Sequence, residues 1–310
     1  MKVLITGGAG FIGRWTVKRF LEEGYEVCAL DNLENSTEAN ITDFKGCRRF
    51  SFLKGDIIHP QTLAEAFRYG PDLCLHLAAR TKVSESLREP QAAVHVNVLG
   101  TVNVLEAARK KGTKTIIVGT CLVYQDSWPG AQVDERSPVN PLSPYAASKL
   151  SADYLALTYL TAYGLPVVIC RPFNTYGPFQ KGEMEGGVVA VFLGNTLARE
   201  PISVFGDGTQ GRDLMYVEDS VEFLFRAATS DSAVGEVINA GTGRSVTINE
   251  LASLIYKDEG MIKHVSHPCP QSEIRKLVCD YSKAKSLLDW EPKTSLEEGI
   301  AKTRAWMTNQ

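Results

Sequence analysis

The stretch TGGAGFIG at residues 6–13 decides the fold, because it joins an apolar run at residues 2–6 to a helical pattern at residues 11–23. Glycine permits the tight turn between strand and helix, and it lets a pyrophosphate approach the amides at the helix N-terminus. The residues that we expect to bind a dinucleotide here are Gly7, Gly10, Phe11, Ile12 and Gly13. Taken alone, the three glycines also fit an ordinary strand-to-helix turn.

An acidic residue at the end of the next predicted strand favours the dinucleotide interpretation. Asp31 follows the glycines by about 20 residues, the distance at which a carboxylate accepts hydrogen bonds from a ribose diol. A carboxylate repels a 2′-phosphate, so Asp31, followed by Asn32, favours NAD over NADP. Arg14 is a contrary sign, because an arginine just after the last glycine attracts phosphate. We predict NAD as the cofactor.

Short β-branched runs alternate with longer amphipathic stretches through the first half of the chain. The runs that we expect to form buried strands lie at residues 2–6, 26–30, 50–53, 73–76, 115–119 and 167–170. The helical patterns between them lie at residues 11–23, 60–68, 90–111 and 144–163, three of which begin at proline. This alternation predicts an α/β protein with a Rossmann-type, doubly wound parallel sheet.

The second half is less regular and predicts a smaller, interleaved α/β lobe that binds the substrate. Its helical patterns lie at residues 188–199, 217–229 and 248–256. We expect an NAD-binding domain at residues 1–175, to which the chain returns around residues 210–240, and a substrate lobe at residues 176–310.

Composition excludes several classes of protein. With 310 residues, 44% of them hydrophobic and 22% charged, the chain can bury a large core and is neither disordered nor fibrous. A formal net charge of −3 provides no basic surface for nucleic acid or an anionic membrane. Seven scattered cysteines without a C-x-x-C pair, and an N-terminus without signal-peptide regions, predict a cytoplasmic protein. His264, His267 and Cys269 lack the further ligands that a metal site needs.

A tyrosine and a lysine form the candidate catalytic pair. Tyr145 and Lys149, in PYAASK, lie four residues apart on a predicted helix and so share one face. An ammonium beside a phenol favours the phenolate and moves the phenol pKa from about 10 toward the range of a general base. The same spacing also arises by chance in many helices. Catalysis is favoured because the preceding strand ends near Thr120, whose hydroxyl can bridge tyrosine and substrate.

Further short motifs follow one another along nearly the whole chain. In the first half they are TGGAGFIG at 6–13, DN at 31–32, GDI at 55–57, HLAA at 76–79 and NVLGTVNVLEAA at 97–108. In the second half they are RPFNTYGP at 171–178, FGDGTQGRD at 205–213, YVED at 216–219 and NAGTG at 239–243. In this order they resemble the extended short-chain dehydrogenase/reductases of the nucleotide-sugar epimerase and dehydratase family.

The resemblance implies ligand contacts that spacing alone does not assign. For NAD, these are Asp56 and Ile57 at the adenine, Ala78 and Ala79 at the pyrophosphate, Tyr145 and Lys149 at the nicotinamide ribose, and also Leu77 and Asn97. For a nucleotide-diphosphate sugar, they are Ser86, Thr120, Asn174, Val189, Phe205, Arg212, Asn239 and Arg275. Asn174, Arg212 and Arg275 are expected at the diphosphate. Val189, Phe192 and Phe205 are candidates for the nucleobase wall, with core packing as the alternative for each.

The resemblance also implies a shared first step, in which Tyr145 removes a hydroxyl proton while a hydride passes from the sugar to NAD. The second step depends on the residues after Thr120. The 4,6-dehydratases have an Asp-Glu pair there, whereas this chain has Cys121 and Leu122. Leucine moves no proton and a thiol is a weak general acid, so we predict a 4-epimerase, which needs neither. The alternatives are a dehydratase that uses Cys121, or Cys121 as a small buried residue that only fills space.

The resemblance further favours a homodimer. In relatives, the helices that correspond to residues 92–111 and 145–163 form a four-helix interface between two subunits. The alternative is that their apolar faces pack only within this chain's own core.

A non-catalytic NAD-binding sensor is a further alternative, and one substitution separates it from an enzyme. Tyr145→Phe is expected to reduce turnover of nucleotide sugars at least about 100-fold, because the general base is lost. NAD binding, measured by calorimetry, is expected to persist. Unchanged turnover in this variant would contradict the catalytic assignment of Tyr145.

Overall fold

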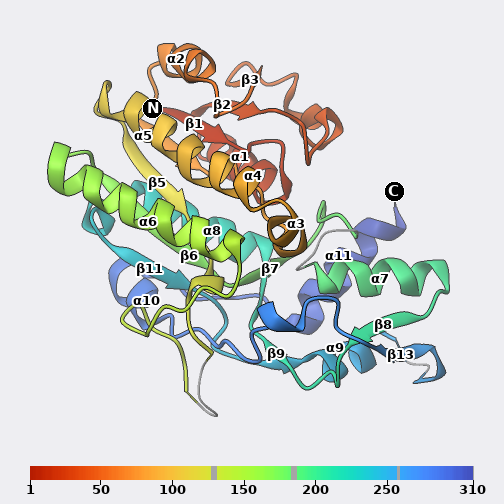
Figure 1. Ribbon diagram of the computed structural model, residues 1–310. Helices are drawn as coiled ribbons and strands as arrows, with labels where there is room; N and C mark the ends of the chain where they lie inside the picture. Colours follow the sequence, from red (N-terminus) through yellow and green to blue (C-terminus); the bar gives the residue numbers. More distant parts are fainter. Residues whose placement is uncertain (127–130, 183–186, 257–258, 310) are drawn as a thin grey trace.

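The computed structural model describes residues 1–126, 131–182, 187–256 and 259–309, and its centre is a seven-stranded sheet (Figure 1). The strands lie in the order β11, β6, β5, β4, β1, β2, β3, and each neighbouring pair is parallel. Their bounds are β1 Lys2–Thr6, β2 Glu26–Asp31, β3 Phe50–Lys54, β4 Leu73–His76, β5 Lys114–Val118, β6 Val167–Pro172 and β11 Val237–Ala240. The predicted α/β class and parallel, doubly wound sheet are confirmed.

Helices cover both faces of this sheet, which explains why its strands are almost continuously apolar. One face carries α1 (Phe11–Glu22), α8 (Val217–Thr229) and α10 (Ser282–Leu288), packed over one buried core cluster. The other carries α2 (Pro60–Arg68), α5 (Thr101–Arg109) and α6 (Pro144–Tyr163), packed over a second. In Figure 1, α5 and α6 lie in front of the sheet. No helix in the described part of the chain is both long and apolar enough to cross a membrane.

The predicted helical segment at residues 90–111 is observed as a continuous helical run that ends at Arg109, and a π-helix interrupts its α-helical hydrogen bonding. The observed segments are α4 (Pro90–Val94), the π-helix His95–Gly100 and α5 (Thr101–Arg109). A Cβ on Gly100 would lie 2.6 Å from Ile57 Cδ1, so another residue type here would require the Ile57 side chain to shift. π-helices are rare and often occur at functional sites. The sequence analysis also missed the helix α3 (Val83–Arg88), which is too short to show a helical periodicity of apolar residues.

The smaller lobe contains the remaining elements. They are α7 (Val188–Ala198), α9 (Ile248–Ile255), α11 (Leu296–Thr308), β7 (Asn174–Tyr176), β8 (Ile202–Phe205), β9 (Gly211–Arg212), β10 (Leu214–Tyr216), β12 (Val246–Thr247) and β13 (Ile262–Val265). Short 3-10 helices lie at Glu38–Phe44, Cys121–Val123, Asp231–Ala233, Glu259–Met261 and Pro270–Ser272. The chain passes back from this lobe to the sheet through α8 and β11. The domain boundary near residue 175 stays a prediction.

The order of the strands reverses between β1 and β4, and this places the ligand site. The chain continues from β1 into α1 on one face, whereas after β4 it passes to α3 and α5 on the other side. Loops that diverge from neighbouring parallel strands leave a crevice at the carboxyl ends of those strands. The glycine loop and the HLAA motif lie at this crevice.

Packing within the glycine loop generates a test of the fold. A Cβ on Gly13 would lie 2.0 Å from the Gly7 carbonyl oxygen, whereas a Cβ on Gly46 would meet nothing within 4 Å. Gly13→Ala is therefore expected to destabilise the protein by about 1–3 kcal/mol or more, and Gly46→Ala to change stability by less than about 1 kcal/mol. Urea denaturation measures both. Equal stabilities would contradict the described packing of the loop.

Candidate active site

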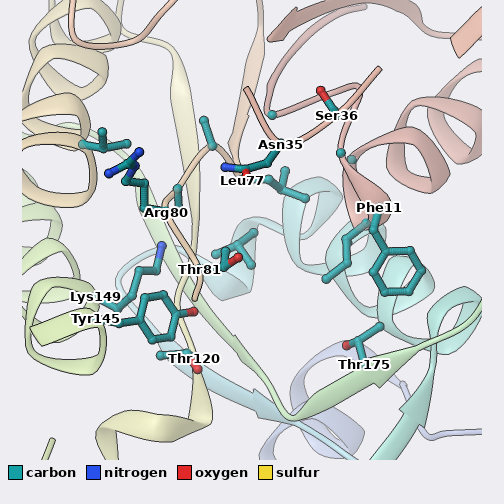
Figure 2. A pocket seen from close by; sticks show the side chains of 18 of the residues that line it. Phe11, Asn35, Ser36, Leu77, Arg80, Thr81, Thr120, Tyr145, Lys149 and Thr175 are labelled. Carbon is teal, nitrogen blue, oxygen red and sulfur yellow. The ribbon is translucent and has the colours of Figure 1, made fainter. Parts of the chain in front are cut away.

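The loops at the carboxyl ends of β1, β2, β4, β5 and β6 surround a cavity of about 350 Å³. Of the predicted site residues, those that line it are Gly7, Gly10, Phe11, Ile12, Gly13, Asp31, Asn32, Asp56, Ile57, Leu77, Ala78, Ala79, Thr120, Cys121, Tyr145, Lys149 and Asn174. Figure 2 shows Tyr145 and Lys149 projecting into it from one side, with Phe11 and Thr175 on the other. One cavity thus combines the predicted cofactor loop and the predicted catalytic pair.

The first turn of α1 presents backbone amides suited to an anion. Its N-cap is Gly10, no side chain caps it, and its first turn holds no acidic residue. Gly7 has a φ of 70°, and a Cβ on it would lie 2.8 Å from the Ala78 nitrogen, so the turn requires glycine. Helix N-terminal amides attract phosphate. These residues therefore fit the pyrophosphate of a dinucleotide.

Asp31 ties the end of β2 to the glycine loop. Its Oδ2 accepts a hydrogen bond from the Ala9 amide at 3.0 Å. Its Oδ1 accepts from the Leu33 amide at 2.9 Å and from the Ser36 hydroxyl at 2.8 Å. A carboxylate has about four acceptor positions, so one remains for a ribose hydroxyl.

Arg14, the contrary sign in the sequence, is occupied elsewhere. Its Nη2 lies 2.5 Å from an Asp43 oxygen, and its guanidinium lies 3.7 Å from the centre of the Phe179 ring. Only 3% of Arg14 is exposed, and burial lowers its pKa while Asp43 opposes that shift. Arg14 does not line the cavity, so the geometry removes the argument for NADP.

Two serine hydroxyls fix the first turn of α6, which carries the tyrosine. The N-cap Ser143 accepts from the Ala146 amide at 3.2 Å, and Ser86 accepts from the Tyr145 amide at 3.1 Å. Lys149 follows one turn later on the same face. Ser86, predicted to bind substrate, thus holds the catalytic helix in place.

Burial sets the charge states of the catalytic pair. It raises the pKa of Tyr145 to about 12, which a hydrogen bond with Thr120 opposes. It lowers the pKa of Lys149, which the negative charge of Asp153 opposes. Burial thus favours a neutral phenol and a neutral amine, whereas the sequence predicted a phenolate beside an ammonium. For the phenolate and the ammonium to form, nearby charges must offset the effect of burial on both pKa values.

Asn97 lies behind the cavity wall and joins two of its parts. Its side-chain oxygen accepts from the Arg80 amide at 2.8 Å, and its nitrogen donates to the Arg80 carbonyl and to the Ser148 hydroxyl, both at 2.9 Å. Ser148 donates in turn to the Tyr145 carbonyl at 2.7 Å. Asn97 therefore holds the loop after β4 against the catalytic helix.

Two predicted diphosphate ligands, Arg212 and Arg275, lie near each other but do not line the cavity. The Gly211 amide donates to the Arg275 carbonyl at 2.8 Å, which brings the two segments together. Burial lowers the pKa of Arg212, and the positive charge of Arg275 adds to that shift. Arg212 Nη1 donates to the Ile274 carbonyl at 2.8 Å, and Arg275 Nη2 lies 3.3 Å from an Asp207 carboxylate oxygen, so each guanidinium already has a partner within the protein.

The other predicted substrate residues are dispersed. Phe205 is 43% exposed and packs edge to face against His267, with ring centres 5.6 Å apart. Val189 is buried in the core of the smaller lobe. Asn239 is buried and accepts a hydrogen bond from the Tyr124 hydroxyl at 2.9 Å. Within the described residues, Val189, Phe205 and Asn239 do not line the cavity.

Known proteins are similar to this chain in sequence and in fold. A family model described as the NAD-dependent epimerase/dehydratase family matches residues 3–241. The solved structure of Pal from Bacillus thuringiensis is 48% identical, with a TM-score of 0.96 and coverage of 100% of this chain and 99% of that one. The UDP-glucose 4-epimerase of Mycolicibacterium smegmatis is 35% identical, over 100% of this chain and 99% of its own length. DesIV, a dTDP-glucose 4,6-dehydratase from Streptomyces venezuelae solved with NAD, is 31% identical, with a TM-score of 0.94 and coverage of 100% and 98%.

The chain belongs to the NAD-dependent epimerase/dehydratase family. Membership confirms the resemblance seen in the sequence motifs and the prediction of NAD as the cofactor. It also shows an enzyme that acts on nucleotide sugars. The relatives include epimerases and dehydratases, so the choice between these reactions rests on the residues beside Thr120.

In this family member, the two residues after Thr120 provide little acid–base chemistry. Cys121 lines the cavity but is only 2% exposed, and burial raises the pKa of its thiol to about 12. The charge of Asp213 adds to that shift and the charge of Arg212 opposes it. Leu122 has no proton to transfer. The Cys121 thiol therefore stays protonated near neutral pH.

Carboxylates are confined to the opposite end of the cavity. Among the described residues that line it, the carboxylates are those of Asp31, Glu34 and Asp56. Asp31 ends β2, which is three strands away from β5 and hence about 14 Å from the Thr120 end. Asp56 follows β3, one strand farther away, and Glu34 pairs with Arg80 at 2.5 Å. None of these groups lies beside the tyrosine.

Sequence reasoning missed several residues that line the cavity, among them Ser36, Arg80, Thr81 and Gln180. Arg80 and Thr81 directly follow the HLAA motif, and Gln180 follows RPFNTYGP by two residues. These three residues could have been predicted from the sequence by including the few residues that follow each motif. Ser36 gives no such signal, because its position depends on the turn that follows Asp31.

The candidate metal ligands do not form a cluster. Within the described ranges, no three His, Cys, Asp or Glu side chains are grouped so that they could hold a metal ion. His264 contacts the Asn249 side chain at 3.0 Å, and His267 accepts a hydrogen bond from the Cys269 amide at 3.0 Å.

The environment of Cys121 generates a chemical test. Raising a thiol pKa from 9.0 to about 12 reduces its thiolate fraction at pH 8 about a thousandfold. In the native protein, iodoacetamide is therefore expected to alkylate the half-buried Cys47 and Cys269 far faster than Cys121, as measured by peptide mass spectrometry. In urea, all three rates should converge. Rapid alkylation of native Cys121 would contradict its assignment as an inert thiol.

Proposed function

We propose that this enzyme is a nucleotide-sugar 4-epimerase that acts through a transient 4-keto sugar. The observation that carries the proposal is the chemistry around Thr120, where Cys121 and Leu122 offer no carboxylate and the cavity carboxylates lie at its far end. Removal of water from a sugar needs an acid for the leaving hydroxyl and a base for the adjacent carbon. Inversion at carbon 4 needs neither group.

In the proposed first step, Tyr145, Thr120 and Lys149 each have a separate role. Tyr145 accepts the proton of the sugar 4-hydroxyl, and Thr120, hydrogen-bonded to Tyr145, orients that hydroxyl. Lys149 supplies positive charge that favours the phenolate. Bound NAD supplies the hydride acceptor, and its positive charge adds to that of Lys149. The proposed second step returns the hydride to the other face of the ketone.

The same groups are expected to bind both epimers, because the diphosphate remains in place while the sugar ring turns. Asn174 lines the cavity next to the catalytic end, and Arg212 and Arg275 lie close together farther along the smaller lobe. Their donors suit a diphosphate without requiring a basic surface. Phe205 and Val189 remain our candidates for the nucleobase wall, and Ser86 and Asn239 remain predicted substrate-binding residues.

We also propose a homodimer formed through the helices of one face. Val94 and Leu99 are 45% and 50% exposed, and Tyr154 and Tyr163 on α6 are 55% and 57% exposed. Large apolar side chains exposed together on neighbouring helices favour contact with another protein surface. A second copy of this chain is the proposed partner.

A panel of nucleotide sugars tests the reaction. Purified protein is incubated with UDP-, dTDP-, GDP- and CDP-linked hexoses, and products are separated by chromatography and weighed by mass spectrometry. The proposal predicts conversion of one substrate into an isomer of unchanged mass. Loss of the mass of one water would contradict it and favour a dehydratase that uses Cys121. Cys121→Ser is the matched variant, which is expected to retain epimerase turnover and to lose any such dehydration.

A further inference from the structure

An ion pair joins two of the loops that line the cavity. Arg80 Nη2 lies 2.5 Å from Glu34 Oε1, and Arg80 Nη1 lies 3.4 Å from a carboxylate oxygen of Glu89. Arg80 belongs to the loop after β4 and Glu34 to the loop after β2, and both residues line the cavity. Figure 2 shows Arg80 on the same side of the cavity as Lys149. The sequence motifs assign no role to Glu34 or Arg80.

The order of the strands places this ion pair across the glycine loop. β1 lies between β2 and β4, so a contact between the loops after β2 and β4 crosses the carboxyl end of β1, where the glycine loop begins. Both loops also touch the glycine loop itself. Asp31 accepts a hydrogen bond from the Ala9 amide at 3.0 Å, and a Cβ on Gly7 would lie 2.8 Å from the Ala78 nitrogen. The glycine loop, its two neighbours and the ion pair therefore form a closed ring of contacts at the expected pyrophosphate position.

A tight turn after β2 holds Glu34 in place. Leu33 has a φ of 65°, a left-handed conformation that residues other than glycine rarely adopt. The Leu33 amide donates to Asp31 Oδ1 at 2.9 Å, and the Glu34 amide donates to Asn32 Oδ1 at 3.0 Å. Such a conformation costs free energy and persists where the surrounding contacts fix it. The side chains of Asp31 and Asn32 thus fix the turn that directs Glu34 toward Arg80.

The backbone of Arg80 is held from the opposite side of the ring. The Asn97 side chain accepts a hydrogen bond from the Arg80 amide at 2.8 Å and donates to the Arg80 carbonyl at 2.9 Å. The Arg80 and Glu34 side chains are 26% and 46% exposed, so water screens their attraction and the pair contributes little to the stability of the fold. A weak contact between two well-held ends opens readily, and its effect is expected on the exchange of a ligand.

The charges around Arg80 favour an ion pair over a dedicated phosphate ligand. Its guanidinium lies between the carboxylates of Glu34 and Glu89, which already compensate its positive charge. Asp31 and Asp56 line the same end of the cavity. A site shaped only to attract the phosphates of a dinucleotide gains nothing from a carboxylate at Glu34, because like charges repel.

We propose that the Arg80–Glu34 ion pair is a latch, a contact that must open before the bound dinucleotide can leave. Loops that close over a ligand often set the rate at which it is released. A 4-epimerase has a chemical need for slow release, because the hydride taken from the sugar must return to the same sugar. The cofactor must therefore stay bound while the ketone turns. This need rests on the proposed function, whereas the latch itself requires only that the protein binds NAD.

Five variants test the latch. Arg80→Gln and Glu34→Gln each remove the ion pair, and the double variant Arg80→Gln with Glu34→Gln removes both of its charges. The charge-swapped variant, Arg80→Glu with Glu34→Arg, restores opposite charges in reversed positions. Arg88→Gln is the matched control, because Arg88 is exposed on α3, does not line the cavity and carries the same charge as Arg80. Since Arg80 and Glu34 are both partly exposed, all of these variants are expected to fold.

The readout is the rate at which NADH leaves the protein, which requires no nucleotide sugar. Protein loaded with NADH is mixed with a large excess of NAD, and the decay of the fluorescence of bound NADH is followed. Release is expected to become about 2- to 5-fold faster in Arg80→Gln and in Glu34→Gln. The double variant is expected to be no faster than either single one, because all three lack the same interaction. Arg88→Gln should release NADH at the original rate, and the charge-swapped variant should recover most of the slow rate.

The effect of Glu34→Gln decides between a latch and a phosphate ligand, because the two roles predict opposite signs. If Arg80 acted by binding the phosphates of the dinucleotide, loss of the Glu34 charge would free Arg80 and remove a repulsion, and NADH would leave more slowly. A latch predicts faster release. Slower or unchanged release in Glu34→Gln would overturn the proposal. Failure of every nucleotide sugar to react would contradict the proposed function instead, and it would leave this measurement intact.

Discussion

The pairing of β1 with β4 is the constraint on which the site depends. Thr6 and His76 face each other across these strands, and the Thr6 hydroxyl lies 2.7 Å from His76 Nδ1. The Thr101 hydroxyl donates to the Asn97 carbonyl at 2.6 Å, so it accepts the hydrogen of His76 Nε2, and Thr6 must donate to Nδ1. A neutral His76 satisfies both bonds, which agrees with burial lowering its pKa to about 3. This network joins the glycine loop, the loop after β4 and the π-helix behind the cavity, and the reversal of strand order beside it opens the crevice.

Tyr145 and Lys149, the proposed catalytic pair, line this crevice and are buried. A buried phenol and a buried amine both favour their neutral forms, whereas a phenolate base requires both to be charged. The glycine loop and Asp31 suit a dinucleotide, and the positive charge of an oxidised nicotinamide bound beside the pair would favour the phenolate.

Much of the fold was predictable, because the strands of a parallel sheet are buried on both faces and stand out as short apolar runs. The glycine loop, Asp31 and the Tyr145–Lys149 spacing were predictable for a similar reason, since each depends on local sequence. The π-helix at His95–Gly100 was not, because the apolar periodicity of residues 90–111 does not distinguish a π-helical turn from an α-helical one. The buried pair Asp153–Arg171 joins residues 18 positions apart, and no spacing rule indicates it. The pKa values of Tyr145 and Cys121 also depend on burial, which the sequence reveals only in part.

The central claim is that the sugar loses and regains one hydride without any acid–base chemistry at its neighbouring carbons. Turnover in heavy water tests this claim most directly, because a hydride that passes to NAD and back does not exchange with solvent. The account predicts an epimer that contains no deuterium at any carbon, even after complete equilibration. Deuterium at carbon 5 or carbon 6 of the product would contradict the account, since it requires a proton to be removed from, or added to, a carbon next to the ketone or beyond it.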